Sequence, residues 1–241
     1  MEHKAPFVVC HMLTSLDGKI DGDFFRAPEA GPAQQAYGSL RGFYRCQATL
    51  YGTTTMLGGY ADGAVSSLPE EAPESSRQDF INPEGLAVGN FIVSMDPQGE
   101  LAFHSHLVAR KGRPASHVIQ ALTQKASPRY LSYLRKRGIS YLFAGEDRLD
   151  CSLLLRKLSG SFGISRLMVA GGGITNQAFL QDGLIDELSL VIAPVADGGN
   201  ALSVFEPASF LPDHVPVPFT VEETKVLPGN TLWLRYHAGK P

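Results

Sequence analysis

Cysteine is scarce in this chain of 241 residues, and the three that occur lie far apart. Cys10, Cys46 and Cys151 are an odd set without a C-x-x-C pair. A disulfide framework needs paired cysteines and a cysteine-based zinc site needs closely spaced ones, so the sequence argues against both. Such cysteine usage is typical of a reducing compartment, and we expect a cytoplasmic protein.

Long charged runs and long apolar runs are missing as well. The 21 Lys and Arg residues nearly balance the 24 Asp and Glu residues, and the formal net charge of −3 gives no reason to expect nucleic acid or an anionic membrane as partner. The first apolar stretch, residues 6–16, is interrupted by His11, is too short to span a bilayer and has no basic leader. We therefore expect no export signal and a small-molecule partner.

The chain does contain enough apolar sequence for one core. Hydrophobic residues make up 44%, and α/β folds of this length commonly form one domain, so we expect a single domain over residues 1–241. Apolar strands alternate with helices, which predicts a mostly parallel sheet with right-handed crossovers. The expected strands are 7–13, 48–51, 91–94, 118–122, 139–143, 167–170 and 187–194. The expected helices are 33–46, one beginning at Pro128, one capped by Asp150, and 175–181.

Two regions depart from this alternation. Residues 58–89 are rich in Pro, Glu, Ser, Gly and Asp, and we interpret them as a long surface loop that is functional, mobile or contains a short element. Near the C-terminus, segments 219–226 and 231–237 flank the turn sequence LPGN and predict an antiparallel hairpin added to the parallel sheet.

The most distinctive local feature is a run of three glycines between an apolar strand and a helix, at residues 167–176 (LMVAGGGITN). Glycines without Cβ atoms let a backbone approach a pyrophosphate, and the N–H groups of a helix N-terminus attract its charge. The alternative is a tight structural turn that needs positive φ, and the run is not the G-x-G-x-x-G of a Rossmann domain. The pattern therefore predicts either a diphosphate-bearing cofactor or a structural turn.

Five segments taken in order are more informative than the glycines alone. They are 14–20 (TSLDGKI), 50–55 (LYGTTT), 169–173 (VAGGG), 183–188 (GLIDEL) and 192–194 (IAP). The set resembles the reductase domain of the riboflavin-biosynthesis deaminase/reductase family, within the dihydrofolate reductase-like fold, from Cys10 to Phe205. The resemblance implies a stand-alone reductase, because this sequence lacks the His-x-Glu and Pro-Cys-x-x-Cys motifs of the zinc deaminase.

The resemblance also implies an architecture and a cofactor. The architecture is a three-layer α/β/α fold with a mostly parallel central sheet and a C-terminal antiparallel hairpin, and NADPH, or alternatively NADH, lies across the strand ends. By position, the backbone near Leu13 and Thr14 would meet the nicotinamide, and the first two glycines of the run would share a cis peptide. The residues beside the remaining cofactor would be Gly52, Thr53, Thr55, Gly171, Gly172, Gly173, Ile174 and Thr175.

The strand that begins at Phe91 bears on the choice of cofactor, since in relatives it ends at the adenine ribose. Asp96 at its end would suit a free 2′-OH better than a 2′-phosphate. Ser94, Lys111 or Arg113 would instead accept the phosphate of NADPH. We expect NADPH to be used with weak discrimination against NADH.

The resemblance has gaps where a substrate would bind. Riboflavin-type reductases carry Asp-Asp-Pro followed by Arg after the Gly-Thr turn, whereas residues 59–62 here are GYAD. Their substrate-facing Glu corresponds to Ala170, and the acid in the first helix of dihydrofolate reductases has no match in 33–46. We predict a poor riboflavin-pathway reductase and a poor dihydrofolate reductase, unless the long loop supplies a group such as Arg77 or Glu71.

Four further residues are candidates for catalysis or substrate binding. Asp17 and Lys19 belong to the segment nearest the proposed nicotinamide and would orient substrate or supply a proton, although Asp-Gly is also a common turn. Tyr37 and Arg41 lie four apart on the expected first helix and would face either the substrate or solvent.

Three histidines and the single tryptophan have structural interpretations. His11 within the first strand is typical of a hydrogen-bonded core histidine, and Trp233 of packing in the hairpin or an interface. His104-x-His106 has no third ligand at metal-binding spacing.

The sequence therefore predicts an NAD(P)H-dependent reductase of a small metabolite, which in the riboflavin-type case is an aminopyrimidine ribose phosphate. Two alternatives remain open: a reductase of a pterin, dihydrofolate or another imine or carbonyl, and a non-catalytic nucleotide-binding protein of the same fold. Relatives pair through the sheet edge or the C-terminal region, and the apolar strand 188–194 favours a homodimer.

Overall fold

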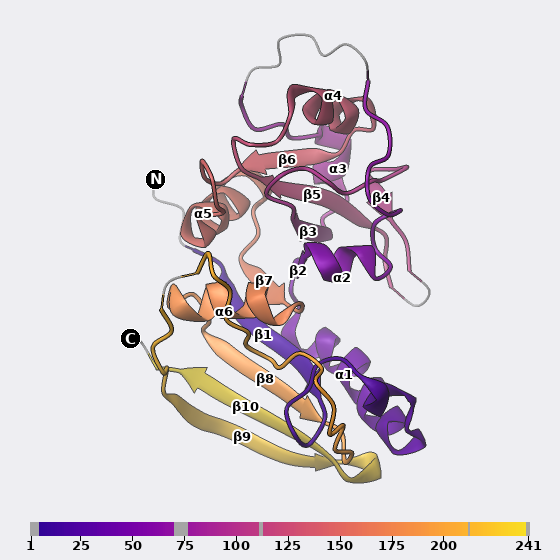
Figure 1. The fold of residues 1–241 in the computed structure, drawn as a ribbon, viewed down its shortest axis with the longest axis vertical. Coiled ribbons are helices and arrows are strands. Elements are labelled where there is room, and N and C mark those ends of the chain that lie inside the picture. Colours follow the sequence, from indigo (N-terminus) through magenta and orange to yellow (C-terminus); the bar gives the residue numbers. More distant parts are fainter. Residues whose placement is uncertain (1–4, 70–76, 111–112, 212, 240–241) are drawn as a thin grey trace. The chain divides into compact units, whose positions relative to one another are not determined.

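The computed structural model describes residues 5–69, 77–110, 113–211 and 213–239. The chain forms two compact units, each with its own strands and helices (Figure 1). The split unit consists of Phe7–Cys46 and Arg166–Pro241, and the inserted unit consists of Gln47–Ser165 with Met1–Pro6. The expectation of a single domain over residues 1–241 stays a prediction.

In the split unit, three parallel strands are extended by an antiparallel hairpin. The strand order is β7 (Arg166–Val169), β1 (Phe7–Thr14), β8 (Glu187–Ile192), β10 (Thr231–Ala238) and β9 (Phe219–Leu227). β1 lies parallel to both β7 and β8, whereas β10 runs antiparallel to β8 and β9. The apolar sequence of β1 is buried from Val8 to Thr14, which is typical of a parallel strand covered on both faces.

The helices of the split unit begin and end at recognisable signals. α1 (Gly31–Tyr44) has a proline in its first turn and ends at Arg45 in the left-handed region, and it packs against β1 and β8. α6 (Gly173–Gln181) follows β7 directly. Short 3₁₀ turns occupy Asp23–Arg26, Pro28–Ala30 and Pro228–Asn230.

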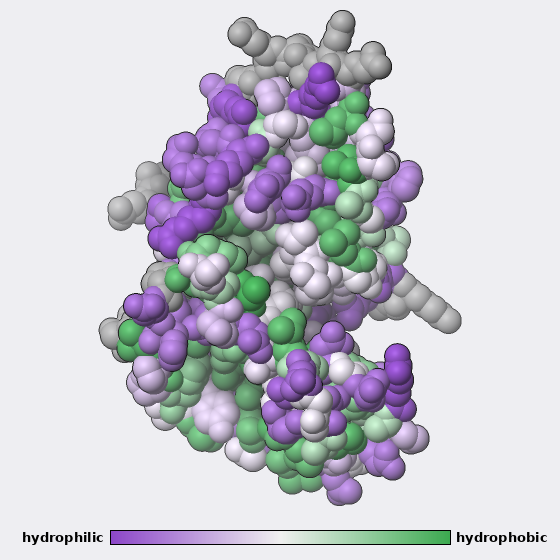
Figure 2. Space-filling model, in the orientation of Figure 1, coloured by the Kyte–Doolittle hydropathy of each residue, from purple (hydrophilic) through white to green (hydrophobic). Residues whose placement is uncertain are grey.

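The apolar strand expected to favour a homodimer does not lie at a sheet edge. β8 is paired by β1 on one side and by β10 on the other, and Leu188 and Val191 are buried. The apolar residues of β8 are therefore used within the sheet of one chain, and the expected homodimer stays a prediction. The edge strand is β9, where Val221 and Val226 are 58% and 75% exposed, and Figure 2 shows apolar surface along the hairpin strands.

The inserted unit contains a second set of mostly parallel strands. β2 (Ala48–Gly52), β3 (Phe91–Met95) and β5 (Ser116–Leu122) are parallel neighbours in that order. β6 (Ser140–Phe143) pairs in parallel with the end of β5, and β4 (Leu107–Val108) pairs antiparallel with its start. Because β5 and β6 are buried throughout, helices or loops cover both of their faces.

The described residues of the inserted unit form the helices α2 (Thr53–Leu57), α3 (Pro83–Ala87), α4 (Pro128–Lys136) and α5 (Cys151–Phe162). The Ser127 hydroxyl caps α4 by accepting from Tyr130 N, and the Asp150 carboxylate caps α5 by accepting from Leu153 N. Both helix starts were expected from these capping residues. The sequence did not indicate α2 or α3.

The long loop expected at residues 58–89 contains short regular elements. α3 lies near its end, and isolated bridges join Ala64 to Leu101 and Phe80 to Tyr141. The interpretation that the segment contains a short element is thus confirmed for the part outside residues 70–76, which lie beyond the described residues.

Two backbone findings concern expectations from the sequence. No peptide bond among the described residues is cis, so the cis peptide expected between Gly171 and Gly172 is wrong. Across the same part of the chain, every helix is too short or too polar to cross a membrane.

Candidate functional site

The predicted cofactor residues are divided between the two units. In the split unit, β1 and β7 run parallel, with Cys10 opposite Val169, so their carboxyl ends meet at one edge of the sheet. Leu13 and Thr14 end β1 at this edge, and the glycine run follows β7 there. The structure therefore brings the predicted nicotinamide residues and the glycine turn together within one unit. Ligands of parallel α/β sheets commonly bind at this edge.

Gly172 has the geometry that the glycine run predicted. It adopts φ 76° and ψ 125°, a conformation with positive φ that favours glycine, and it occupies the N-cap position of α6. Gly172 has no side chain that could accept a hydrogen bond from the N–H groups of the first helical turn. In that turn Ile174 is 40% exposed and Thr175 is 9% exposed. This helix N-terminus can attract an anion.

Gly173 serves the protein's own packing. A Cβ atom at this position would lie 2.5 Å from Glu206 Cγ and 2.6 Å from the Ser203 carbonyl oxygen. Glu206 N donates to the Gly173 carbonyl across 3.1 Å, and the Glu206 carboxylate accepts from Ser203 N across 2.5 Å. The third glycine is thus required by the 203–206 segment, and the expectation that residues 171–175 cradle a pyrophosphate stays a prediction.

Asp17 holds two loops of the split unit together. Its carboxylate accepts hydrogen bonds from the Ser15 hydroxyl at 2.6 Å and from the backbone N–H groups of Asp197 and Gly198 at 2.8 and 3.0 Å. These hydrogen bonds, the one from Ser15 above all, hold the pKa of Asp17 well below its ordinary value. Asp17 is therefore ionised at neutral pH and does not carry a proton there.

Lys19 closes the turn that Asp17 begins. Its carbonyl accepts from Ser15 N at 3.0 Å, and its own N–H donates to the Ser15 hydroxyl at 2.9 Å. A backbone bridge joins Lys19 to Ser203, in the same segment that covers Gly173. Among the described residues, no carboxylate forms an ion pair with the Lys19 ammonium group.

Tyr37 and Arg41 face the sheet of the split unit. The Tyr37 ring stacks on the His11 ring with centroids 4.6 Å apart, and the Arg41 guanidinium lies 5.9 Å from the Tyr37 centroid. His11 Nε2 lies 3.1 Å from the Tyr37 carbonyl oxygen, which can only accept, so this nitrogen carries the proton. The pair therefore covers β1, and both residues are half-buried.

His11 is the hydrogen-bonded core histidine that the sequence predicted. Its Nδ1 accepts from the Ser189 hydroxyl at 2.9 Å, and the same hydroxyl oxygen accepts from Trp233 Nε1 at 2.9 Å. Burial is the main cause that lowers the pKa of His11 to about 4. Trp233 is 3% exposed and belongs to β10, so its expected role in hairpin packing is confirmed.

A buried ionic cluster beside His11 was not expected from the sequence. Arg235 donates to both oxygens of Glu187, at 2.7 and 2.9 Å, and the Tyr44 hydroxyl donates to Glu187 Oε1 at 2.6 Å. Burial alone would raise the pKa of Glu187, but the hydrogen bonds from Arg235 and Tyr44 outweigh burial and lower it. These partners lie on β8, β10 and α1, so only the fold reveals them.

Ala170, which has no polar side-chain group, directly follows the last residue of β7. It is 6% exposed and precedes the glycine turn directly. The position that a substrate-facing Glu holds in riboflavin-type reductases is thus apolar and nearly buried here.

In the inserted unit, Gly52, Thr53 and Thr55 lie where β2 passes into α2. Gly52 is the N-cap residue of α2, and the Thr53 hydroxyl donates to the Met95 carbonyl at 2.7 Å. This hydrogen bond joins the carboxyl ends of β2 and β3. Thr55 lies inside α2 and is half-buried. The structure therefore brings these residues close to the end of the strand that carries Ser94.

Ser94 and Asp96 are not available to a cofactor ribose. Ser94 is 0% exposed and Asp96 is 1% exposed. The Asp96 carboxylate accepts from the backbone N–H groups of Glu100 and Leu101 and from the Tyr130 hydroxyl. The expectation that Asp96 faces the ribose is corrected, because a carboxylate at the end of β3 is used to close the turn that follows. Lys111 lies outside the described residues.

The other polar residues noted in the sequence have separate partners. His104 Nδ1 lies 2.6 Å from Asp62, whereas His106 Nδ1 lies 3.2 Å from His117 Nδ1. Arg77 donates to the carbonyl oxygens of Gln124 and Ala126 at 2.8 and 2.7 Å. Glu71 lies outside the described residues.

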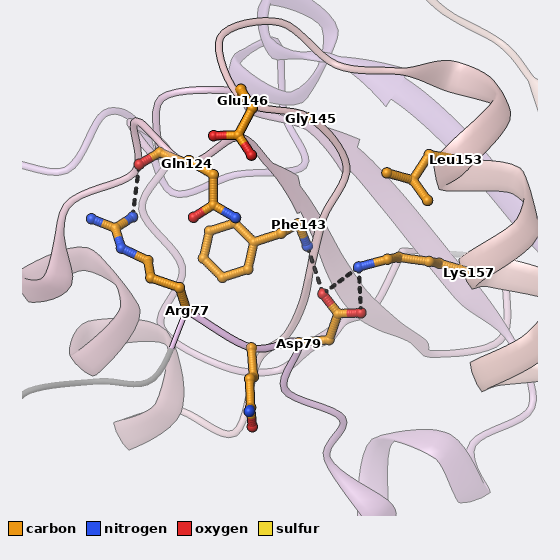
Figure 3. A pocket seen from close by; sticks show the side chains of 9 residues that line it. Arg77, Asp79, Gln124, Phe143, Gly145, Glu146, Leu153 and Lys157 are labelled. Atoms are coloured by element: carbon orange, nitrogen blue, oxygen red, sulfur yellow. Dashed lines mark hydrogen bonds and ion pairs between the residues drawn. The ribbon is translucent and has the colours of Figure 1, made fainter.

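An open pocket of about 700 Å³ lies at the carboxyl ends of β5 and β6 (Figure 3). On one side Asp79 accepts from Lys157 Nζ at 2.7 Å and from Phe143 N at 2.8 Å; on the other side lies Arg77. The Phe143 ring lies between these two sides. The Asp79, Lys157 and Arg77 side chains already have protein partners, and of the candidate residues named from the sequence only Arg77 lines the pocket.

Comparison with known proteins adds a family and a set of relatives. The model of the family described as "RibD C-terminal domain" matches residues 6–228. A 2,5-diamino-6-ribosylamino-4(3H)-pyrimidinone 5′-phosphate reductase of Methanothermobacter thermautotrophicus is 42% identical over 79 residues, 33% of this chain and 36% of that protein. The Archaeoglobus fulgidus reductase of the same name is 26% identical over 207 residues, 86% of this chain and 89% of that protein.

Solved structures agree with the fold. A pyrimidine reductase-like protein from Corynebacterium diphtheriae superposes with a TM-score of 0.68 and 18% identity, covering 98% of this chain and 93% of that one. The mixed α/β fold with a mostly parallel sheet and C-terminal antiparallel strands, which the sequence resemblance implied, is confirmed. The first sequence match covers only about a third of its relative's length, 36%.

Proposed function

Since this chain belongs to the family of the RibD C-terminal domain, we propose that it is an NAD(P)H-dependent reductase of a small metabolite. We further propose that it reduces a ribosylaminopyrimidine phosphate, the class of compound named for its relatives, but with low catalytic efficiency because Ala170 stands in place of the substrate-facing acid. The observation that carries the proposal is the α6 N-terminus behind Gly172, which lies at the sheet edge where β1 ends.

The residues at this edge fit a dinucleotide. Gly172 has no side chain to fill the approach to the first turn of α6, and Ile174 in that turn is 40% exposed, while the 203–206 segment covers Gly173. When bound, the cofactor would supply the hydride, and the protein would supply orientation and electrostatics.

Asp17 and Lys19 have different proposed roles. Because Asp17 is ionised and bonded to three donors, we assign it the positioning of the 195–203 segment against the end of β1. Lys19, whose ammonium has no carboxylate partner among the described residues, is the candidate proton donor to the reduced substrate.

NADPH oxidation tests this proposal. The experiment first measures NADPH and NADH binding by cofactor fluorescence and then follows oxidation at 340 nm (the usual nicotinamide absorbance) against an aminopyrimidine ribose phosphate, dihydrofolate and a pterin. Turnover of the aminopyrimidine ribose phosphate supports the proposal. Cofactor binding without turnover of any acceptor would favour a non-catalytic nucleotide-binding protein, and absence of cofactor binding would overturn the proposal.

A second candidate function keeps the cofactor and changes the acceptor. Ala170 is the observation that favours it, because a nearly buried apolar residue stands where a substrate-facing acid is expected. If the acceptor is an imine or carbonyl that needs no acid at this position, the same assay should show NADPH oxidation with that acceptor and none with the aminopyrimidine ribose phosphate.

We propose in addition that two copies pair through the edge of the split unit's sheet. β9 presents an unpaired strand edge with Val221 and Val226 exposed. Sedimentation equilibrium of the wild type and of Val226→Lys tests this, since a dimer paired there should weaken in the variant. A wild-type monomer, or a dimer that the variant leaves unchanged, would contradict it.

A further inference from the structure

Tyr60 of the inserted unit is held between an aromatic ring and a guanidinium. The Tyr51 and Tyr60 ring centroids lie 4.4 Å apart with planes inclined by 27°, and the two hydroxyls are 2.8 Å apart. Arg110 Cζ lies 4.1 Å from the Tyr60 centroid. Both partners are too close to share one face of the ring, so they take opposite faces. Because Tyr51 is 3% exposed and belongs to β2, the stack is anchored in the sheet.

A second arginine lies beside the same ring. Arg113 N donates to the Arg110 carbonyl at 3.0 Å, and Arg113 Nη1 lies 3.4 Å from the Tyr60 hydroxyl. Gly59 makes the approach possible: it adopts φ 138°, and a Cβ atom there would lie 2.7 Å from Arg110 Nη2. The local backbone is therefore shaped around the Arg110 guanidinium.

The part of the chain that the structure describes contains no acidic partner for these two positive charges. Among the described residues, no carboxylate lies within 4.0 Å of either guanidinium. Asp62, the acid nearest to Tyr60 in sequence, is bound by the backbone N–H and by Nδ1 of His104, each at 2.6 Å. Two like charges on one tyrosine repel each other, and a bound anion would remove that repulsion.

The stacking also prepares Arg110 for an anion. A guanidinium that lies flat on a ring uses its face for the contact and leaves its in-plane N–H groups free. Those N–H groups match the oxygens of a phosphate in a bidentate arrangement, and the Tyr60 hydroxyl adds a donor beside them. Phosphate dianions suit such a pair of arginines better than a single carboxylate does.

We propose that Arg110 and Arg113, held by Tyr60, bind a phosphomonoester. Riboflavin-type reductases carry an arginine after their Gly-Thr turn, and residues 59–62 of this chain contain none. Tyr60 in this segment instead contacts Arg110 and Arg113, which lie about fifty residues further along the chain. The inference rests on the proposed function only for the identity of the molecule that carries the phosphate. That molecule is either NADPH, through its 2′-phosphate, or the substrate.

Two pairs of small probes test the binding without any need for activity. Titrations of the full-length protein followed by NMR compare adenosine 2′-phosphate with adenosine, and ribose 5-phosphate with ribose. The Arg110→Ala/Arg113→Ala variant should lose at least tenfold in affinity for one phosphorylated probe, about 1.4 kcal/mol, and nothing for its unphosphorylated partner. Loss for the first probe identifies the cofactor phosphate, and loss for the second identifies the substrate phosphate.

Arg137→Ala is the matched control, because Arg137 Cζ lies 3.8 Å from the Tyr133 ring centroid in the same unit and no second arginine of the described residues lies on that ring. The proposal is overturned if the double variant binds every phosphorylated probe as the wild type does, if the control loses as much, or if the wild type binds none of them. Steady-state reduction by wild type and double variant separates this inference from the proposed function. If the wild type reduces substrate but the double variant binds the phosphorylated probes as well as the wild type, the arginine site is rejected and the proposed function stands. If the double variant loses phosphate binding but the wild type reduces no substrate, the proposed function is rejected and the arginine site stands.

Discussion

The Tyr130 hydroxyl donates to the Asp96 carboxylate across 3.0 Å in the core of the inserted unit. The same carboxylate caps the turn after β3 by accepting from Glu100 N and Leu101 N. Burial is the main cause that raises the pKa of Asp96, while these hydrogen bonds act in the opposite direction. Asp96 therefore organises a buried turn, whereas its place at the end of an apolar strand had suggested a contact with the cofactor.

The first prediction follows from that arrangement. Asp96→Asn places an amide NH₂ group against backbone donors and should lower the free energy of unfolding by about 1–3 kcal/mol. The ratio of NADPH to NADH affinity should stay unchanged in the folded protein, because the side chain does not reach solvent. Urea unfolding and cofactor titration measure the two quantities. Glu100→Gln, an exposed acid of the same turn, is the control, and a changed cofactor ratio in a stable Asp96→Asn protein would restore the original interpretation.

The second prediction concerns the N-terminus of α6. Ile174→Glu adds a negative charge to an exposed position in the first helical turn, where an acid favours the helix but repels a pyrophosphate. NADPH affinity should fall at least tenfold, about 1.4 kcal/mol, without loss of thermal stability. Ile174→Gln separates charge from shape and should bind NADPH nearly as well as wild type.

Gly172→Val complements this test at the N-cap. The substitution adds a β-branched side chain to a backbone at φ 76°, so it should weaken both folding and NADPH binding. If Ile174→Glu and a folded Gly172→Val protein both bind NADPH like the wild type, the pyrophosphate does not lie at this helix.

The third prediction is a pH dependence of stability. Burial lowers the pKa of His11 to about 4, and the same cause lowers the pKa of His117 to about 4. In the unfolded chain these histidines titrate near pH 6.5. Between pH 6.5 and 4 the folded state thus binds fewer protons than the unfolded state, and stability falls as the pH falls through this window. For His11 alone the loss is about 3 kcal/mol.

Urea unfolding at a series of pH values measures this loss. His11→Gln should flatten the pH dependence below pH 6.5, whereas His214→Gln, an exposed histidine of the same unit, should leave it unchanged. An unchanged slope for His11→Gln would mean that His11 is not buried in its neutral form.

The fourth prediction concerns catalytic efficiency. Without an acid at Ala170, kcat/KM for the aminopyrimidine ribose phosphate and for dihydrofolate should stay below about 10⁴ M⁻¹s⁻¹, the lower end of the ordinary enzyme range. Ala170→Glu should raise the value for one of these substrates, because a charged hydrogen bond to a bound substrate is regained. A wild-type value above that limit on either substrate would refute the prediction, and Ala170→Gln controls for side-chain size.

Local sequence determined which segments become strands and helices. The apolar run in β1, the capping residues Ser127 and Asp150, and the turn before β10 act on neighbours in sequence, so each element could be predicted from its own residues. The short α3 was missed because its proline-rich surroundings resemble a loop, and Asn82 caps it through a single hydrogen bond to Glu84 N.

Tertiary structure decided what the polar residues do. Asp96 follows the end of β3 and Gly173 begins α6, which are positions that typically contact a cofactor. Their partners Tyr130 and Glu206 instead come from distant parts of the chain and use them for packing. Conversely, nothing near Tyr60 in sequence indicates that Arg110 lies on its ring. The periodicity and spacing of residues in a sequence indicate contacts within one helix or strand. The burial of a side chain, its pKa and its charged neighbours depend on which other segments the fold places beside it.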